Sequence, residues 1–149
     1  MRPRKDADSS EGEPKDTLRN IGETKEFAIS IVTFDLLEAM NLTSGEYDAT
    51  VNEWSLARIT PEPCQLVRPT RVKESPVSFE CKFYQILDFS AAPTSSSLVI
   101  GQIVTIHVDD AHLREGHLDR NSLDLVGRMG SIRYTRTTTR VDLARPAVK

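Results

Sequence analysis

The chain has 149 residues, of which 38% are hydrophobic and 28% charged, a composition typical of a single globular domain with its own core. The net charge of −3 argues against a nucleic-acid-binding protein, because a strongly basic face would need a matching acidic one elsewhere. No apolar run approaches membrane-spanning length and the first residues have no apolar signal segment, so we expect a cytoplasmic protein that does not enter membranes.

The beginning of the chain differs from the remainder in composition. Residues 1–14 are polar, mixed in charge and without periodicity, so we expect them to form a disordered arm. The globular domain is expected to comprise residues 15–149. Its two cysteines, Cys64 and Cys81, have no metal-binding spacing and are expected to be unlinked thiols.

A helix is predicted to begin at Asp16 or Thr17, because both are residue types that cap helix N-termini. Leu18 and Ile21, one turn apart, give this helix its apolar side. Lys15 adds a positive charge beside the free backbone N–H groups of the first turn, which is the local chemistry of an anion site. The alternative is an ordinary helix cap with a solvated lysine, and the residue types alone favour that alternative.

A buried strand is predicted at residues 27–32, FAISIV, because this run is apolar, rich in β-formers and too short for a helix. Thr33 is expected to cap a short helix that follows the strand. The apolar stripe of that helix consists of Leu36, Leu37 and Met40.

Residues 45–76 are rich in prolines and turn formers and are predicted to form a long excursion that packs on the domain or on a neighbouring subunit. A short helix is expected within it, at residues 51–57. The larger apolar residues of the excursion are expected to anchor it. They are Trp54, Leu56, Ile59, Leu66 and Val67.

Two long strands are predicted to pair as an antiparallel hairpin, at residues 77–89 and 98–109. In the first, apolar and polar side chains alternate, which places Glu80 on a solvent face. Since Glu74 lies on a loop, the two carboxylates are not expected to form an acid–base pair. In the second strand both faces are largely apolar, as in a barrel whose outer wall is buried in a dimer.

Four segments in order carry a resemblance to a known family. They are KDTLRNI at residues 15–21, followed by EF, an apolar strand, EAMN and TS; VKESPVSFEC at residues 72–81; SLVIGQIVTIHVDD at residues 97–110; and GRMGSIRYTR at residues 127–136. Together they resemble the flavin reductase-like family, whose members are FMN-binding split β-barrels. The resemblance implies a mainly β fold with short helices (α+β), with residues 110–125 forming a loop followed by a short helix.

The resemblance begins in the middle of the family's domain. About the first third of that domain lies upstream of the KDT motif, whereas only fourteen residues precede Lys15. We therefore expect a partial FMN-binding split barrel, truncated at its N-terminus.

The resemblance also implies a function. Family members form homodimers that bind FMN at the subunit interface and pass a hydride from NAD(P)H to the flavin and on to an acceptor. The isoalloxazine ring carries this chemistry, so no dedicated catalytic residue is expected. Lys15, Asp16 and Thr17 match positions beside the FMN phosphate and ribityl chain. His107 is placed near the flavin or the subunit interface, and a merely hydrogen-bonded strand histidine is an equal alternative.

Several features leave alternatives open. Tyr134 packs near the cofactor if the family's C-terminal motif applies, and a buried core tyrosine explains it equally. His107, His112 and His117 lack a recognised metal-ligand spacing, so no metal is expected. The sequence GRMG, at residues 127–130, is interpreted as a turn. The competing hypothesis for the whole chain is a non-catalytic truncated remnant that acts as a dimerisation or scaffold module.

Overall fold

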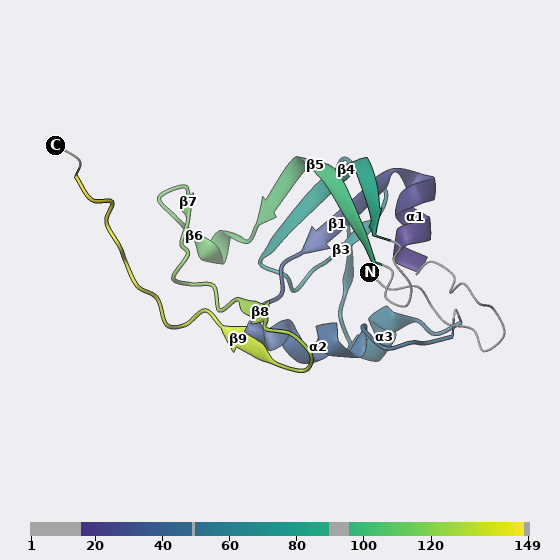
Figure 1. Cartoon of the computed structure of the whole chain (residues 1–149), viewed down its shortest axis with the longest axis horizontal. Helices are drawn as coiled ribbons and strands as arrows, with labels where there is room; N and C mark the ends of the chain where they lie inside the picture. Colours follow the sequence, from purple (N-terminus) through teal and green to yellow (C-terminus); the bar gives the residue numbers. More distant parts are fainter. Residues whose placement is uncertain (1–15, 49, 90–95, 148–149) are drawn as a thin grey trace.

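The computed structural model describes residues 16–48, 50–89 and 96–147 (Figure 1). The arm expected at residues 1–14 and the first proposed site residue, Lys15, lie outside the described residues. Most of the regular structure is β-strand, accompanied by a few short helices. The predicted fold class is therefore confirmed.

A three-stranded antiparallel sheet forms the centre of the fold, in the order β1-β4-β5 (Figure 1). The predicted pairing of the two long strands, β4 and β5, is confirmed. β1 is shorter than the predicted strand and half-buried rather than buried, since Ile29 in it is 42% exposed. The strands span Glu26–Ser30 (β1), Val77–Phe89 (β4) and Ser96–Val108 (β5).

The first helix, α1 (Asp16–Thr24), packs against β1 and buries Ile21. Lys25 has a positive φ of 59° and reverses the chain between helix and strand, and its backbone N–H donates to the Ile21 carbonyl at 2.9 Å. The helix therefore meets the sheet at the Glu26 end of β1 (Figure 1).

The expected helix after the first strand is present as a 3-10 turn, η1 (Phe34–Leu36), that continues into α2 (Leu37–Leu42). Thr33 precedes it but makes no capping bond with its side chain, so this expectation was wrong. The backbone of Thr33 instead forms an isolated β-bridge with Leu125, which ties the helix start to the C-terminal part of the chain. The predicted short helix in the excursion is confirmed as α3 (Glu53–Ala57), which packs beside α2 (Figure 1).

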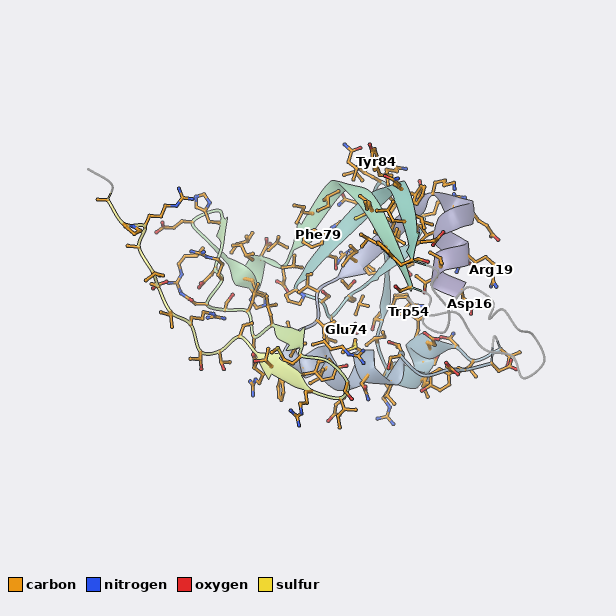
Figure 2. The ribbon with its side chains drawn as sticks, in the orientation of Figure 1. Asp16, Arg19, Trp54, Glu74, Phe79 and Tyr84 are labelled. Atoms are coloured by element: carbon orange, nitrogen blue, oxygen red, sulfur yellow. The ribbon has the colours of Figure 1, made fainter. Side chains whose placement is uncertain are left out.

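The excursion at residues 45–76 folds back toward the sheet, but its apolar residues do only part of the anchoring. Val67 is buried, and Trp54 is half-buried and extends from α3 toward the sheet (Figure 2). Leu66 is 55% exposed and Leu56 39% exposed, so the prediction that they act as anchors was wrong. The excursion contains the paired strands β2 (Pro61–Pro63) and β3 (Thr70–Val72).

The segment after β5 differs from the expected loop and helix. A 3-10 turn, η2 (Asp110–His112), comes first, and a tight hairpin follows it. Glu115 and Gly116 both have positive φ at the tip of this hairpin, which is the geometry of a two-residue hairpin turn. A second hairpin lies beside α2 (Figure 1) and contains residues 127–130 at the end of its first strand and the start of its turn. The strands are β6 (Leu113–Arg114), β7 (His117–Leu118), β8 (Val126–Arg128) and β9 (Tyr134–Arg136).

β5 carries large apolar side chains that the described part of the chain leaves uncovered. Leu98 is 51% exposed, Ile103 49% and Ile106 57%. Among the residues that the structure describes, β5 also lies at the edge of the sheet and pairs with β4 alone. The described residues of one copy therefore do not cover this strand on both sides, and the expectation that a dimer buries its outer face stays a prediction.

Candidate functional site

The proposed phosphate-binding turn lies at the start of α1. The Asp16 carboxylate accepts a hydrogen bond of 2.8 Å from Arg19 Nη2, one turn further along the helix (Figure 2). Thr17 is exposed to solvent. Because the first backbone N–H groups of a helix have no partners within it, this turn offers donors to an anion, and Arg19 offsets the negative charge of Asp16.

His107 lies at a different place in the fold. The register of the sheet aligns it with Ser78 and Ser30, at the opposite end of β1 from Glu26, where α1 meets the sheet. The structure therefore does not bring His107 together with Asp16. The assignment of all these residues to cofactor binding stays a prediction.

The imidazole of His107 contacts a buried carboxylate that the sequence had placed on the solvent face. Nε2 of His107 lies 2.5 Å from Oε1 of Glu80, and Glu80 is 0% exposed. The prediction for Glu80 was wrong because the excursion covers this face of β4. The Glu80 carboxylate accepts hydrogen bonds from the backbone N–H groups of Gln65, Leu66 and Val67, at 2.7, 2.6 and 3.2 Å.

A second carboxylate on the same face holds the next residue of the excursion. The Glu26 side chain accepts hydrogen bonds from the backbone N–H of Arg68 at 2.9 Å and from its Nε at 3.1 Å. Lys82, opposite Glu26 in the sheet, donates from Nζ at 2.5 Å. Glu26 and Glu80, here called the carboxylate clamp, thus bind the four successive backbone amides of residues 65–68.

The hydrogen bonds keep both clamp carboxylates ionised. Burial alone would raise the pKa of Glu80, but the Gln65 amide, His107 and the Leu66 amide outweigh it and lower the pKa to about 2. The Lys82 ammonium, followed by Arg68, lowers the pKa of Glu26 to about 2. The clamp is thus a charged structural element at neutral pH.

The hydroxyl groups near the clamp have hydrogen-bond partners, and the nearby thiol is not a reactive one. The hydroxyl of Ser78 donates to the Ser30 hydroxyl at 3.2 Å, and that oxygen accepts a hydrogen bond of 3.0 Å from the backbone N–H of Val72. Burial and the charge of Glu80 raise the pKa of the nearby Cys64 thiol, so it is no ready nucleophile. Cys64 and Cys81 are both free thiols.

An open cleft lies between α2 and the β8–β9 hairpin, with a volume of about 360 Å³. Tyr134 is half-buried in its wall rather than in the core, and its place near the cofactor stays a prediction. The cleft includes no residue of α1 and does not include His107. It is lined by Leu37, Glu38, Asn41, Ser44, Arg128, Ser131, Ile132 and Tyr134.

The described residues were expected to hold no metal site, and they contain no group of three or more His, Cys, Asp or Glu side chains placed to hold a metal ion. Nδ1 of His112 instead lies 2.7 Å from the Ser122 hydroxyl. No helix in the described ranges has the length and apolar character needed to cross a bilayer.

Similar proteins are known at the level of sequence and of structure. The pattern that defines the flavin reductase like domain matches residues 9–125. An uncharacterised protein of Aquifex aeolicus is 33% identical over 123 residues, which are 82% of this chain and 61% of that protein. This chain thus spans less than two thirds of that relative.

Two solved structures share the fold over most of the chain. The 2-nitrobenzoate 2-nitroreductase of Pseudomonas fluorescens is 30% identical with a TM-score of 0.78, over 89% of this chain and 65% of that one. Component B of nitrilotriacetate monooxygenase from Bacillus cereus is 26% identical with a TM-score of 0.81, over 95% of this chain and 69% of that one.

Proposed function

Because the chain belongs to the flavin reductase-like domain family, we propose that it binds FMN and acts in an oxidoreductase that passes a hydride from NAD(P)H through the flavin to an acceptor. The observation that carries this proposal is the match of the family pattern to residues 9–125. The similarity to a nitroreductase and to a monooxygenase component supports redox chemistry of the same broad kind.

The start of α1 fits the phosphate of FMN. The first backbone N–H groups of a helix have no partners within the helix, so the start of this nine-residue helix suits an anion, and the exposed Thr17 hydroxyl adds a further donor. In the sequence, Lys15 directly precedes that turn and carries a positive charge, and the carboxylate of Asp16 accepts a hydrogen bond from Arg19. When bound, the isoalloxazine ring of FMN supplies the hydride chemistry, and the residues of this chain position the cofactor.

The remaining parts of the proposal are the assembly and the role of His107. We place the flavin between two copies of the chain, in a cytoplasmic homodimer, and His107 near the flavin or that interface. The exposed apolar side chains of β5 support this assembly, because they form a surface that a second copy of the chain can cover. Nε2 of His107 is engaged by Glu80, so any contact with the flavin uses another atom of the ring.

FMN binding is tested by titrating the purified protein and following the quenching of flavin fluorescence. The double variant Lys15→Ala/Thr17→Ala removes a charge-assisted and a hydroxyl contact to the phosphate and should weaken binding at least about tenfold. The matched control is Asn52→Ala, which removes a cap at the start of another helix, α3, and should bind FMN like the wild type. Equal affinities for the wild type and the double variant would remove the α1 turn from the site.

The non-catalytic dimerisation module remains the second proposal, because β5 exposes a run of apolar side chains at a sheet edge. It predicts a protein that dimerises without taking up FMN. Sedimentation with and without FMN separates the two proposals, since saturable FMN binding contradicts the second one.

A further inference from the structure

The cleft between α2 and the β8–β9 hairpin has the form of a small-molecule site. Its volume of about 360 Å³ is ample for a single aromatic ring, because a cavity of about 150 Å³ is enough to hold benzene. One wall comes from α2 and contributes Leu37, Glu38 and Asn41; the other comes from the hairpin and contributes Arg128 and Tyr134.

Polar groups without partners converge on this cleft. Within the described part of the chain, the Glu38 carboxylate, the Asn41 side-chain amide and the Tyr134 hydroxyl have no hydrogen-bond partner. The Arg128 guanidinium uses only Nη2, which donates to the Ser131 carbonyl at 2.9 Å. An apolar-walled cleft with a few convergent and unused polar groups is the common form of a ligand site.

In the part of the chain that the structure describes, a second arginine of the same hairpin, Arg136, has a carboxylate partner that Arg128 lacks. Arg136, on the paired strand β9, lies with Cζ 3.7 Å from the centre of the Phe34 ring and also pairs with the Asp124 carboxylate through Nε and Nη2. Arg128 lies over the Tyr134 ring in the same manner, at 5.9 Å, but it has no ion pair among the described residues. The same cation-and-ring arrangement thus occurs twice, once with its carboxylate and once without.

The turn between β8 and β9 holds the hairpin wall in place before any ligand binds. The backbone N–H of Met129 donates to the Arg133 carbonyl at 2.9 Å, and Gly130 and Ser131 have the positive φ values of 96° and 49° that close the turn. Ile132, at its tip, is 89% exposed on the cleft rim. An isoleucine held so far into solvent gives a ligand ring an apolar surface to cover.

From these contacts we propose that the cleft binds a small aromatic carboxylate whose ring bears an amino or hydroxyl donor. The ligand carboxylate pairs with Arg128 and takes the place that Asp124 has beside Arg136. The ring packs on Leu37 and Ile132, and the donor group binds the Glu38 carboxylate. The site is separate from the start of α1, so the inference goes beyond the proposed flavin function and does not depend on it.

Calorimetric titration of the flavin-free protein with 4-aminobenzoate tests the inference. Saturable binding is expected, with weaker binding of benzoate, which lacks the donor, and at least about tenfold weaker binding of 4-aminobenzamide, which lacks the carboxylate. Arg128→Gln should lose at least about tenfold in affinity for 4-aminobenzoate. The control Arg133→Gln, a charge removed from the same turn at a residue that does not line the cleft, should bind like the wild type.

Two further variants test the roles of the cleft rim and of the acidic side chain in ligand binding. Ile132→Ser changes a side chain that is 89% exposed, so this variant should fold normally and still lower the affinity for 4-aminobenzoate. Glu38→Ala removes the acceptor for the ligand's amino group and should remove the preference for 4-aminobenzoate over benzoate. The inference is overturned if the wild type shows no saturable binding, or if Arg128→Gln and Arg133→Gln bind 4-aminobenzoate equally. FMN is absent from these titrations, so failure of flavin binding leaves their result unchanged.

Discussion

The carboxylate clamp and the cleft between α2 and the β8–β9 hairpin both combine an acidic and a basic side chain, but their surroundings differ. In the clamp, Glu80 is fully buried and bonded to His107 and three backbone amides. In the cleft, Glu38 and Arg128 are exposed, and neither has an ion pair within the described residues. A charge whose partners are all supplied by the chain holds the fold together, whereas convergent charges without partners are available to a ligand.

The largest expected effect is the loss of the buried member of the clamp. Glu80→Ala leaves three amides and His107 without the fully buried acceptor that they share, so the free energy of unfolding should fall by about 4 kcal/mol. The measurement is urea denaturation followed by circular dichroism.

Glu74→Ala is the matched control for that variant. Glu74 also accepts a bond from a backbone amide of the excursion, that of Thr60 at 3.0 Å, but it lies at the exposed surface. Its loss should cost much less stability than the loss of Glu80, because water can replace the carboxylate. Equal costs would show that the clamp has no special role.

The clamp also predicts how stability depends on pH. The folded pKa of Glu80 is about 2 against an ordinary value of 4.5, so its contribution is complete above pH 4.5 and is lost as the pH falls toward 2. Glu26 contributes in the same direction, through Lys82 and Arg68. Denaturation midpoints across this range should fall steeply for the wild type and less steeply for Glu80→Gln. Parallel curves would contradict the assignment of a lowered pKa to Glu80.

The smallest expected effects on stability come from the two arginines of the β8–β9 hairpin. Arg136→Gln removes an ion pair with Asp124 and a contact with Phe34, and should lower the thermal midpoint by a few degrees. Arg128→Gln removes no ion pair and should leave the midpoint nearly unchanged. A loss for Arg128→Gln as large as that for Arg136→Gln would show that Arg128 supports the fold.

The sequence predicts the sheet well but misplaces its buried acid. β4 was predicted with its observed bounds and β5 within two residues, because regular alternation and apolar runs report the local backbone directly. The same alternation placed Glu80 on a solvent face. Whether that face meets water depends on the distant residues 65–68 folding over it, which no local pattern in the strand reveals.

Other differences between prediction and structure also arise from features that the local sequence pattern does not reveal. The β6–β7 hairpin depends on two residues with positive φ, Glu115 and Gly116, and only the glycine signals this in the sequence. Thr33 has the residue type of a helix cap, but it pairs with Leu125 from the far end of the chain. The cleft was missed because Arg128, Glu38 and Tyr134 come from separate elements that meet only in the folded chain.

The most direct test of the account is amide chemical-shift mapping of the labelled protein during a titration with FMN. We expect the largest shifts at the amides of residues 16–19, at the start of α1, and little change at Arg128 and Ser131 in the cleft. Large shifts at the cleft with none at α1, or no shift at any amide, would contradict the proposal that the start of α1 binds the flavin phosphate.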